Sequence, residues 1–308
     1  MIKQVRTRLD TLLNTFRLNT LTREVAAAEA ALPAADRTAV VFNASTRLGN
    51  ISLNAAYSLL TVWGLRQSGW RVIHFVCQAG MSRCLLGSSE HDPDQPPPCS
   101  ICVATSRSIF AGAETAPIIF QRDEGLAAAL ADLSTAQLAA FSYDDLPLGE
   151  LVLPSIRWRM RRHHLEDDRA TLLLFREFIQ SAWQVARDFR ALIDKEHPDL
   201  VLVFNGQMFP EAVAAHIARK RGIHTITHET GYQPDTVFMT TGDATARKVY
   251  LTEEEHTLTP QQNAVLDQYL EERFQGQFSM GGIQFWQDIQ ELPEEIERKL
   301  HELSLIHI

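Results

Sequence analysis

The sequence contains no long hydrophobic run, and this absence limits the classes of protein to which it can belong. A membrane-spanning helix needs ~18 or more consecutive apolar residues, and no stretch of the 308 residues reaches that length. The N-terminal stretch MIKQVRTRLDTLLNTFRL alternates charge with leucine and lacks the apolar core of a secretory signal peptide. We therefore expect a cytoplasmic protein.

An excess of positive charge is also absent. The chain carries 29 lysine and arginine residues against 38 aspartate and glutamate residues, for a formal net charge of −9. This acidic balance argues against a general nucleic-acid binder, whose affinity depends on contacts to phosphates. Peripheral association of the N-terminal segment with a membrane surface is an alternative role for Lys3, Arg6, Arg8 and Arg17, although Asp10 dilutes their charge.

Cysteine is scarce, but its distribution is informative. The chain has four cysteines, and all of them lie between residues 77 and 102 with the spacing C-x6-C-x14-C-x2-C. The segment between them contains PPP, which is incompatible with regular secondary structure. A C-x2-C pair with two further cysteines predicts a tetrahedral thiolate site, zinc first and an iron–sulfur cluster second. The ligands would be Cys77, Cys84, Cys99 and Cys102.

Two other interpretations of these cysteines stay open. His91 is an alternative ligand, and the cysteines are otherwise a redox pair or unrelated reduced thiols. A short helix is predicted at residues 106–111, after the last cysteine.

Two segments have the pattern of strand–helix–strand units. In the first, an apolar run at residues 38–42 is followed by the polar loop NASTRLGN, a helical pattern and a second apolar run at residues 71–76. The loop lacks the three-glycine dinucleotide fingerprint and the phosphate-loop lysine. It opens a helix, whose N-terminus favours anions, so it is either a plain turn or a contact to an acceptor or phosphate. The substrate-binding candidates here are Asn43, Arg47 and Gly49.

The second unit covers residues 199–235, DLVLVFNGQMFPEAVAAHIARKRGIHTITHETGYQPD. An apolar run at residues 200–204 precedes a helical pattern at residues 211–221, and a second strand is predicted at residues 223–227. Two such units predict an α/β fold with a doubly wound parallel sheet flanked by helices. Open sheets of this kind bind ligands outside the carboxyl ends of their strands. Asn205, Gln207, His228 and Glu229 are therefore expected in a binding crevice.

One basic stretch interrupts the acidic chain at residues 157–164, RWRMRRHH. Arginine forks suit a phosphate or pyrophosphate clamp. The simpler interpretation is a solvated helix face whose charges pair with Glu166, Asp167 and Asp168.

The combination of FNGQ at residues 204–207, an alanine-rich helix and HETG at residues 228–231 resembles the amino-terminal half of bacterial GT-B glycosyltransferases, of the group that makes capsule and cell-surface polysaccharides. The family often has arginine at the position of Gln207. The resemblance implies a Rossmann-like, GT-B-type amino-terminal domain that faces the acceptor, a glycan or a lipid-linked sugar. It also implies a nucleotide-sugar donor held mainly by a carboxyl-terminal domain.

Sugar transfer needs a base for the acceptor hydroxyl or a carboxylate facing the developing positive charge. Glu229 and His228 are the best-placed candidates because they lie at a strand's carboxyl end, and Asp235 is the third. A carboxylate that caps backbone amides is the alternative role for Glu229.

The expected organisation has four parts: an N-terminal helical segment at residues 1–37, the acceptor-side domain with its cysteine loop at residues 38–275, the truncated start of a linker or second domain at residues 276–302, and a non-native tail at residues 303–308. The tail, LSLIHI, is what the codons of a transposon end used in sequencing libraries encode. We expect a chain without its donor domain to be inactive alone.

Two other classes of function remain open from the sequence. The first is an iron–sulfur α/β enzyme subunit, of the dehydratase or reductase type, and the second is a non-catalytic binding module stabilised by a metal.

Overall fold

The computed structural model describes residues 17–18, 20–28, 32, 35–44, 52–89, 92–231, 236–242, 245, 257–274, 279–280 and 283–284. The chain divides into two compact units. The first consists of Met1–Glu229 and Val237–Lys248, and the second of Thr230–Thr236 and Val249–Ile308.

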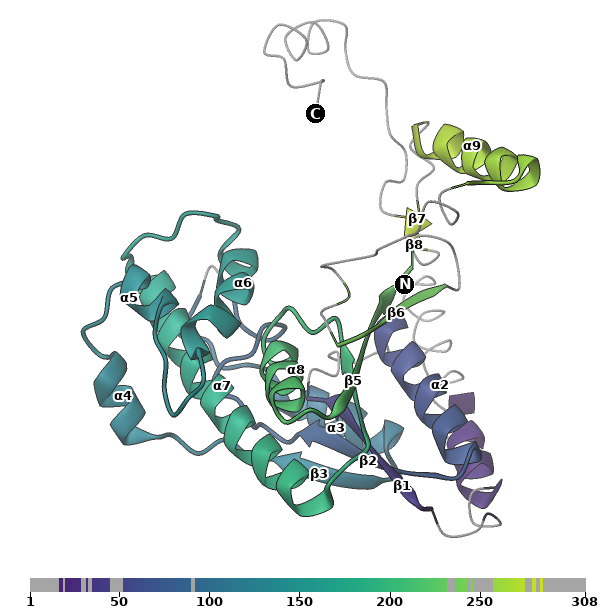
Figure 1. The fold of residues 1–308 in the computed structure, drawn as a ribbon. Coiled ribbons are helices and arrows are strands. Elements are labelled where there is room, and N and C mark those ends of the chain that lie inside the picture. Colours follow the sequence, from purple (N-terminus) through teal and green to yellow (C-terminus); the bar gives the residue numbers. More distant parts are fainter. Residues whose placement is uncertain are drawn as a thin grey trace, which may run out of the picture. The chain divides into compact units, whose positions relative to one another are not determined.

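The first unit is built on a six-stranded sheet with the strand order β3-β2-β1-β4-β5-β6 (Figure 1). All neighbouring pairs from β3 to β5 are parallel. The strands are β1 (Arg37–Asn43), β2 (Trp70–Cys77), β3 (Glu114–Ile118), β4 (Leu200–Phe204), β5 (His224–Thr230) and β6 (Val237–Thr241). Both predicted strand–helix–strand units are confirmed, and so is the α/β class with a parallel, Rossmann-like sheet flanked by helices.

Helices connect these strands and cover the sheet. They are α2 (Leu53–Gln67), α3 (Cys99–Ile109), α4 (Glu124–Leu130), α5 (Thr135–Ala139), α6 (Leu148–Met160), α7 (Arg169–Glu196) and α8 (Glu211–Lys220). The longest, α7, has 28 residues and is capped by Asp168, whose carboxylate accepts a hydrogen bond from the backbone N–H of Thr171. It contacts α4, α5 and α6 as well as α8 and β3, and it therefore joins the outer helices to the sheet (Figure 1).

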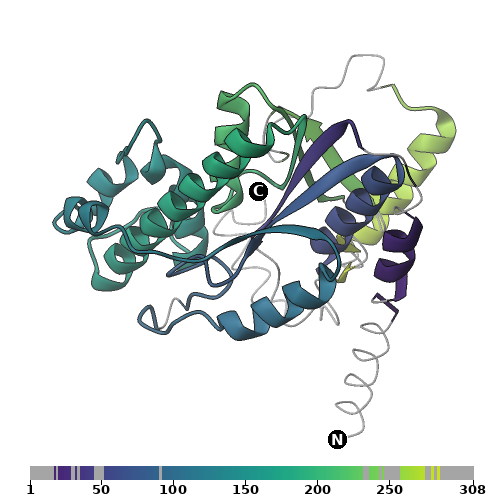
Figure 2. The same cartoon turned by 90° about the horizontal axis from the view of Figure 1, so that it is seen from below.

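Both faces of the sheet are buried, which explains why its strands have continuous apolar sequences. Successive strand residues point to opposite faces, and helices lie on both sides of the strands in Figure 2. One face packs on α2 through Ala39, Val41, Val62, Leu200 and Leu202. The other belongs to the largest core cluster, together with α7 and α8, through Val40, Phe42, Phe189, Val201, Val203 and Val213.

The order of the strands reverses direction between β1 and β4. From β1 the chain proceeds outward to β2 and β3, and it then returns to β4 on the other side of β1. At such a switch point the loops that leave the two central strands diverge to opposite faces, and a crevice forms between them. The ends of β1 and β4, at Asn43 and Phe204, therefore border the natural binding position of this fold.

The second unit includes the helix α9 (Pro260–Phe274) and the two short antiparallel strands β7 (Ser279–Met280) and β8 (Ile283–Gln284). The α9 helix begins with proline at its first position, as its sequence predicts. This helix belongs to the segment Val249–Ile308 of the second unit. The acceptor-side domain predicted at residues 38–275 stays a prediction.

The predictions for the two ends of the chain are tested only in part. The N-terminal helical segment packs on the first unit, because Leu18 contacts the cluster of Leu59 and Ile109, and Gln67 donates a hydrogen bond to the carbonyl of Val25. The expected tail at residues 303–308 lies outside the described residues. In the portion of the chain that is described, no helix has both the length and the apolarity to cross a membrane.

Candidate functional site

A cavity of about 300 Å³ lies at the carboxyl ends of β1, β2, β4 and β5, at the switch point of the sheet. Its wall is mainly apolar, with a small number of polar groups, which is the usual composition of a small-molecule site. The polar side chains that line it are Asn43, Ser52, Asn54, Ser58, Asn205, Glu211 and Glu229, and the four cysteines line it as well.

Asn205 and Glu229 form a linked pair in this wall. Asn205 follows β4 with a positive φ of 54°, a conformation that asparagine tolerates better than most residues. Its Oδ1 accepts a hydrogen bond from the backbone N–H of Gln207 at 3.0 Å, which fixes the side chain in a local turn. Its Nδ2 donates to Glu229 Oε2 at 2.8 Å. The turn therefore orients the carboxylate of the neighbouring strand.

Asn43 is held in a comparable way at the end of β1. Its amide contacts His74 Nδ1 at 2.9 Å, and its Oδ1 accepts a hydrogen bond from the hydroxyl of Ser58. Burial, together with the charge of Arg66, lowers the pKa of His74 to about 3, so the ring is neutral at pH 7. A neutral ring accepts at one nitrogen only, and the short contact indicates that Nδ1 accepts from the Asn43 amide.

His228 and Glu229 are adjacent in sequence, but the structure gives them different environments. His228 is only 1% exposed, lies against the ring of Phe204 and is not among the residues that line the cavity. Burial lowers its pKa to about 4. Within the described residues its Nδ1 has no hydrogen-bond partner. Adjacent strand residues point to opposite faces, and only Glu229 of this predicted acid–base pair lines the cavity.

The remaining predicted contacts divide into two groups. Gln207 contributes its backbone N–H to the turn at Asn205, and its side chain does not line the cavity. Arg47, Gly49 and Asp235 lie outside the described residues, and their predicted roles remain predictions.

The four cysteines come from three consecutive parts of the chain and line one side of the cavity. Cys77 ends β2, Cys84 lies in the loop that follows, and the last two begin α3. The predicted helix at residues 106–111 in fact begins at Cys99, directly after the proline run, so Cys99 and Cys102 share one face of its first turn. All four are free thiols.

Two of the sulfurs accept hydrogen bonds from backbone amides. Gly80 N–H donates to Cys77 Sγ at 3.2 Å, and Gly87 N–H donates to Cys84 Sγ at 3.3 Å. Burial raises the pKa of Cys77 to about 12 and that of Cys102 to about 11. Among the described residues, no group of three or more His, Cys, Asp or Glu side chains is arranged to hold a metal ion. The prediction of zinc with converging sulfurs therefore has no support from these positions, and it stays a prediction.

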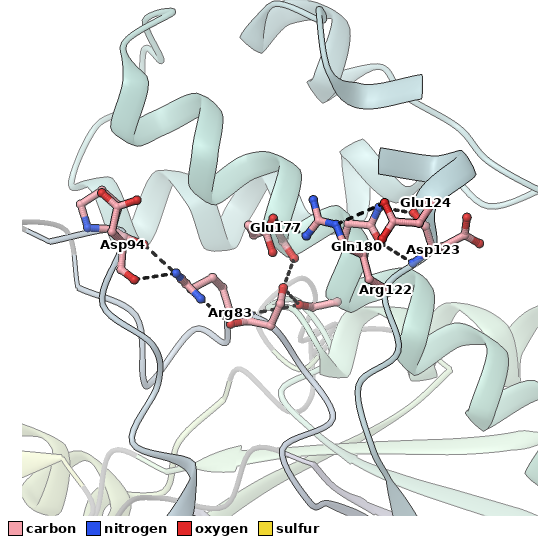
Figure 3. Close-up of polar contacts among 10 residues, drawn as sticks. Arg83, Asp94, Arg122, Asp123, Glu124, Glu177 and Gln180 are labelled. Atoms are coloured by element: carbon pink, nitrogen blue, oxygen red, sulfur yellow. Dashed lines mark hydrogen bonds and ion pairs between the residues drawn. The ribbon is translucent and has the colours of Figure 1, made fainter. Parts of the chain in front are cut away.

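The loop that carries Cys84 is held in place by its own polar contacts (Figure 3). The guanidinium of Arg83 donates to three backbone carbonyls, those of Ser82 at 2.8 Å, Pro93 at 3.1 Å and Asp94 at 2.8 Å. The hydroxyl of Ser82 contacts Ser181 of α7 at 3.2 Å. These bonds attach the proline-rich loop to α7 and connect its two ends.

The loop between β3 and α4 is attached to the same helix. Arg122 forms an ion pair with Glu177 at 2.9 Å, and Gln180 exchanges hydrogen bonds with the backbone of Asp123 (Figure 3). Residue Trp183 adds a bond from its indole N–H to the Asp123 carboxylate at 2.9 Å. Two loops at the carboxyl edge thus share α7 as their support.

Several lining residues are absent from the sequence-based candidates. Glu211 is an ordinary acidic residue in the first turn of α8, and Ser52 and Asn54 have the pattern of a helix start, so no local signal distinguishes them. Trp158 belongs to the basic stretch predicted as a phosphate clamp or a solvated face, but its ring reaches the cavity. The ion pair between Arg162 and Asp168 at 2.8 Å agrees with a solvated face for the end of that stretch.

Comparisons with known proteins do not assign the chain to a family. No family model matches it, and no curated protein matches it significantly in sequence.

Proposed function

We propose that the cavity binds the acceptor of a nucleotide-sugar-dependent glycosyltransferase of cell-surface polysaccharide or glycoconjugate synthesis. In this proposal the first unit is a GT-B-type amino-terminal domain, and a further domain outside the described residues holds the donor. One observation carries the proposal: a carboxylate oriented by an asparagine, Glu229 held by Asn205, lines a cavity at the switch point of a parallel sheet.

The chemistry of sugar transfer suits this arrangement. The acceptor hydroxyl must lose a proton as it attacks the anomeric carbon, and a carboxylate within hydrogen-bond reach accepts it. Because Asn205 donates to Oε2, the orientation of the Glu229 carboxylate is fixed before substrate binds. His228 is neutral and buried, so in this mechanism it supports β5 rather than exchanging a proton with the acceptor.

The rest of the wall also suits a sugar. A pyranose has hydroxyl groups around its edge and C–H groups on its faces. Asn43, Ser52 and Asn54 offer hydrogen-bonding groups, and Trp158 offers an aromatic ring that is 39% exposed. Arg161 lies over that ring with its guanidinium carbon 5.0 Å from the centroid, which holds the indole in position.

A second candidate function is favoured by one specific observation, the four cysteines in the same cavity wall. An iron–sulfur enzyme subunit of the dehydratase or reductase type would use a cluster at this position to bind or reduce its substrate. Its activity would require the cysteines, whereas sugar transfer would require Glu229.

The proposal is tested by carbohydrate binding, with an array of bacterial capsule and lipopolysaccharide glycans as the probe. We expect the chain to bind a defined subset of glycans, and Glu229→Gln to weaken that binding because a charge-assisted hydrogen bond to a sugar hydroxyl becomes a neutral one. The matched control is Glu114→Gln, at the amino end of β3, which should leave binding unchanged. Binding that is absent, or equal in wild type and Glu229→Gln, contradicts the proposal.

The rate of sugar transfer is a sharper measurement than binding. It requires a protein in which a donor-binding domain accompanies the residues described above. Glu229→Gln keeps the size of the side chain and an oxygen that accepts from Asn205, so the fold should persist. Transfer should fall by about 10²–10⁴-fold, the usual contribution of one acid–base group. Undiminished turnover would exclude Glu229 from the mechanism.

A further inference from the structure

The wall of the cavity has two chemically different parts. The ends of β1, β4 and β5, with the N-terminal parts of α2 and α8, contribute its amides, hydroxyls and carboxylates. The loop after β2 and the helix α3 contribute the other part, and every described side chain that lines the cavity from these two segments is apolar or a thiol. We call six residues of this part the thiol wall: Cys84, Leu85, Leu86, Cys99, Cys102 and Val103.

The thiols of this wall are uncharged. Burial raises the pKa of Cys102 to about 11, and burial is also the main cause of the raised pKa of Cys84 and of Cys99. These side chains are therefore protonated at pH 7, and a protonated thiol packs like a small hydrophobic group. The thiol wall thus offers an apolar surface to a ligand, although half of its residues carry sulfur.

The thiol wall is partly accessible, and the loop that carries Cys84 is fixed. All six residues are half-buried. A Cβ added to Gly87 would lie 2.8 Å from Pro97 Cβ and 3.1 Å from Cys84 Sγ, so the loop already packs closely on the proline run. Arg83 connects the two ends of the loop through its bonds to backbone carbonyls. Covering such a preorganised apolar surface releases water and orders few side chains, which favours binding.

The two parts of the wall meet near the start of α8. Glu211 lines the cavity and is only 3% exposed. Its charge adds to the effect of burial on the pKa of Cys84, which requires the carboxylate and the thiol to be near one another. A ligand that occupies the polar part beside Glu229 therefore has the thiol wall within the same cavity.

The volume of the cavity limits what can lie against the thiol wall. An apolar cavity of ~150 Å³ lined by leucine, isoleucine and phenylalanine is large enough to bind benzene. The cavity of this protein has about 300 Å³. It therefore has room for one group of the size of a benzene ring beside one sugar ring, whereas a long polyisoprenyl chain would exceed it.

We propose that the thiol wall is the subsite for an apolar aglycone, an aromatic ring or a short alkyl group attached to the acceptor sugar, whose hydroxyl groups face Glu229. The assignment of the aglycone rests on the proposed function, whereas the apolar subsite itself does not. In this role the cysteines are part of an apolar surface, and in the iron–sulfur alternative they are ligands.

The apolar subsite is tested with N-phenyl-1-naphthylamine, a neutral fluorophore that brightens in apolar surroundings. We expect wild type to bind it. Val103→Asp places a charge in the thiol wall and should weaken binding by about tenfold or more. The matched control is Ala104→Asp, which adds the same charge at an exposed neighbouring position of α3 and should bind like wild type. Wild type that does not bind, or equal affinity in Val103→Asp, overturns the subsite.

The aglycone is tested by displacement of the fluorophore with pairs of methyl and phenyl β-glycosides of glucose, galactose and N-acetylglucosamine. For each sugar that binds, the phenyl glycoside should displace the fluorophore at an about 10–100-fold lower concentration, because its ring covers more apolar surface. Equal displacement by both members of each pair overturns the aglycone. Fluorophore binding that depends on Val103 but is displaced by no glycoside contradicts the sugar proposal and leaves the apolar subsite in place.

Two further measurements address the thiols. Cys102→Val removes a potential metal ligand but keeps a small apolar side chain, so the affinity for the fluorophore should stay within about twofold of wild type. A large loss in this variant overturns the apolar role of the thiols. If Val103→Asp is unfolded by circular dichroism, maleimide labelling of wild type replaces it. Saturation with the fluorophore should slow the labelling of the cysteines, and an unchanged rate overturns the subsite.

Discussion

The two ends of the parallel sheet hold their polar groups in different ways. At the amino ends, charged side chains form ion pairs near the surface: Arg71 of β2 pairs with Glu114 of β3 and with Glu196 at the end of α7. At the carboxyl ends, amides, hydroxyls and thiols line a cavity, and the two histidines beside it are buried with lowered pKa values.

The difference indicates where binding is expected. At the amino edge, the charges of Arg71 and Lys195 are balanced by those of Glu114 and Glu196, with which they form ion pairs. At the carboxyl edge a carboxylate is oriented by the side chain of Asn205, and backbone N–H groups point at sulfur. Such preorganised groups in a cavity are a feature of sites rather than of scaffolds.

The largest effect on stability is expected from a buried hydrogen bond between α6 and the loop that follows β4, at the carboxyl edge of the sheet. The hydroxyl of Ser155 in α6 accepts a hydrogen bond of 2.7 Å from the backbone N–H of Phe209, in the cavity loop after β4, and both residues are 0% exposed. Ser155→Ala leaves that N–H buried and unpaired. We expect urea unfolding to show a loss of about 1–3 kcal/mol.

Ser106→Ala is the control for this prediction. Ser106 is also buried, but within the described residues its hydroxyl has no hydrogen-bond partner. Its removal should leave the free energy of unfolding unchanged or slightly raised. A loss of equal size in both variants would mean that the support from Ser155 is only packing.

A smaller effect is expected from the neutral histidine at the end of β5. The pKa of His228 is about 4 in the folded chain because of burial, against about 6.5 when unfolded. Between these values the unfolded chain binds a proton that the folded chain does not, so stability falls as the pH is lowered through this window. We expect wild type to lose about 1–2 kcal/mol more than His228→Leu between pH 7 and pH 5.

The comparison of wild type with His228→Leu isolates the titration of His228, because His74 is present in both proteins. Urea unfolding of wild type and His228→Leu at the two pH values is the measurement. Parallel curves for wild type and His228→Leu would contradict a lowered pKa at His228.

The smallest effect on the free energy of unfolding is expected from the loss of the Arg71 ion pairs at the amino edge of the sheet. The Arg71 side chain is 40% exposed, and exposed ion pairs contribute little because water and salt screen them. Arg71→Met should change the free energy of unfolding by less than ~1 kcal/mol, with a smaller change in high salt. A larger, salt-independent loss would show that this edge, too, depends on a desolvated charge network.

The architecture of the first unit could be predicted from the sequence, because its signals are local. Apolar runs of strand length alternate with helical patterns, and β4 has the predicted ends at Leu200 and Phe204. The order of the strands could not be read in this way. It depends on the pairing of β1 with β4 across the whole sequence between them, which no short pattern records.

The residues that line the candidate site were predictable at strand ends and in the cysteine loop, where Cys84, Cys99 and Cys102 also line the cavity. Asn43, Asn205, Cys77 and Glu229 lie at strand ends, and all of them line the cavity. Residues that reach it from helix starts, such as Glu211, or from α6, such as Trp158, have no distinguishing pattern in sequence. The sequence did not predict that Glu229 lines the cavity and His228 does not, because that depends on which face of β5 meets the cavity.

The pairing of β1 with β4 also has a consequence for how the chain acquires its structure. Thr38 and Asp199, which are joined by a hydrogen bond at the start of this pairing, are 161 positions apart. During synthesis at about 5–20 residues per second, β1 would wait roughly 10–30 s for its central partner to leave the ribosome. Contacts of such high sequence separation also slow folding in general. Throughout that interval one edge of β1 is an unsatisfied row of amide and carbonyl groups, and a chaperone that covers such edges would be expected to increase the yield of folded protein.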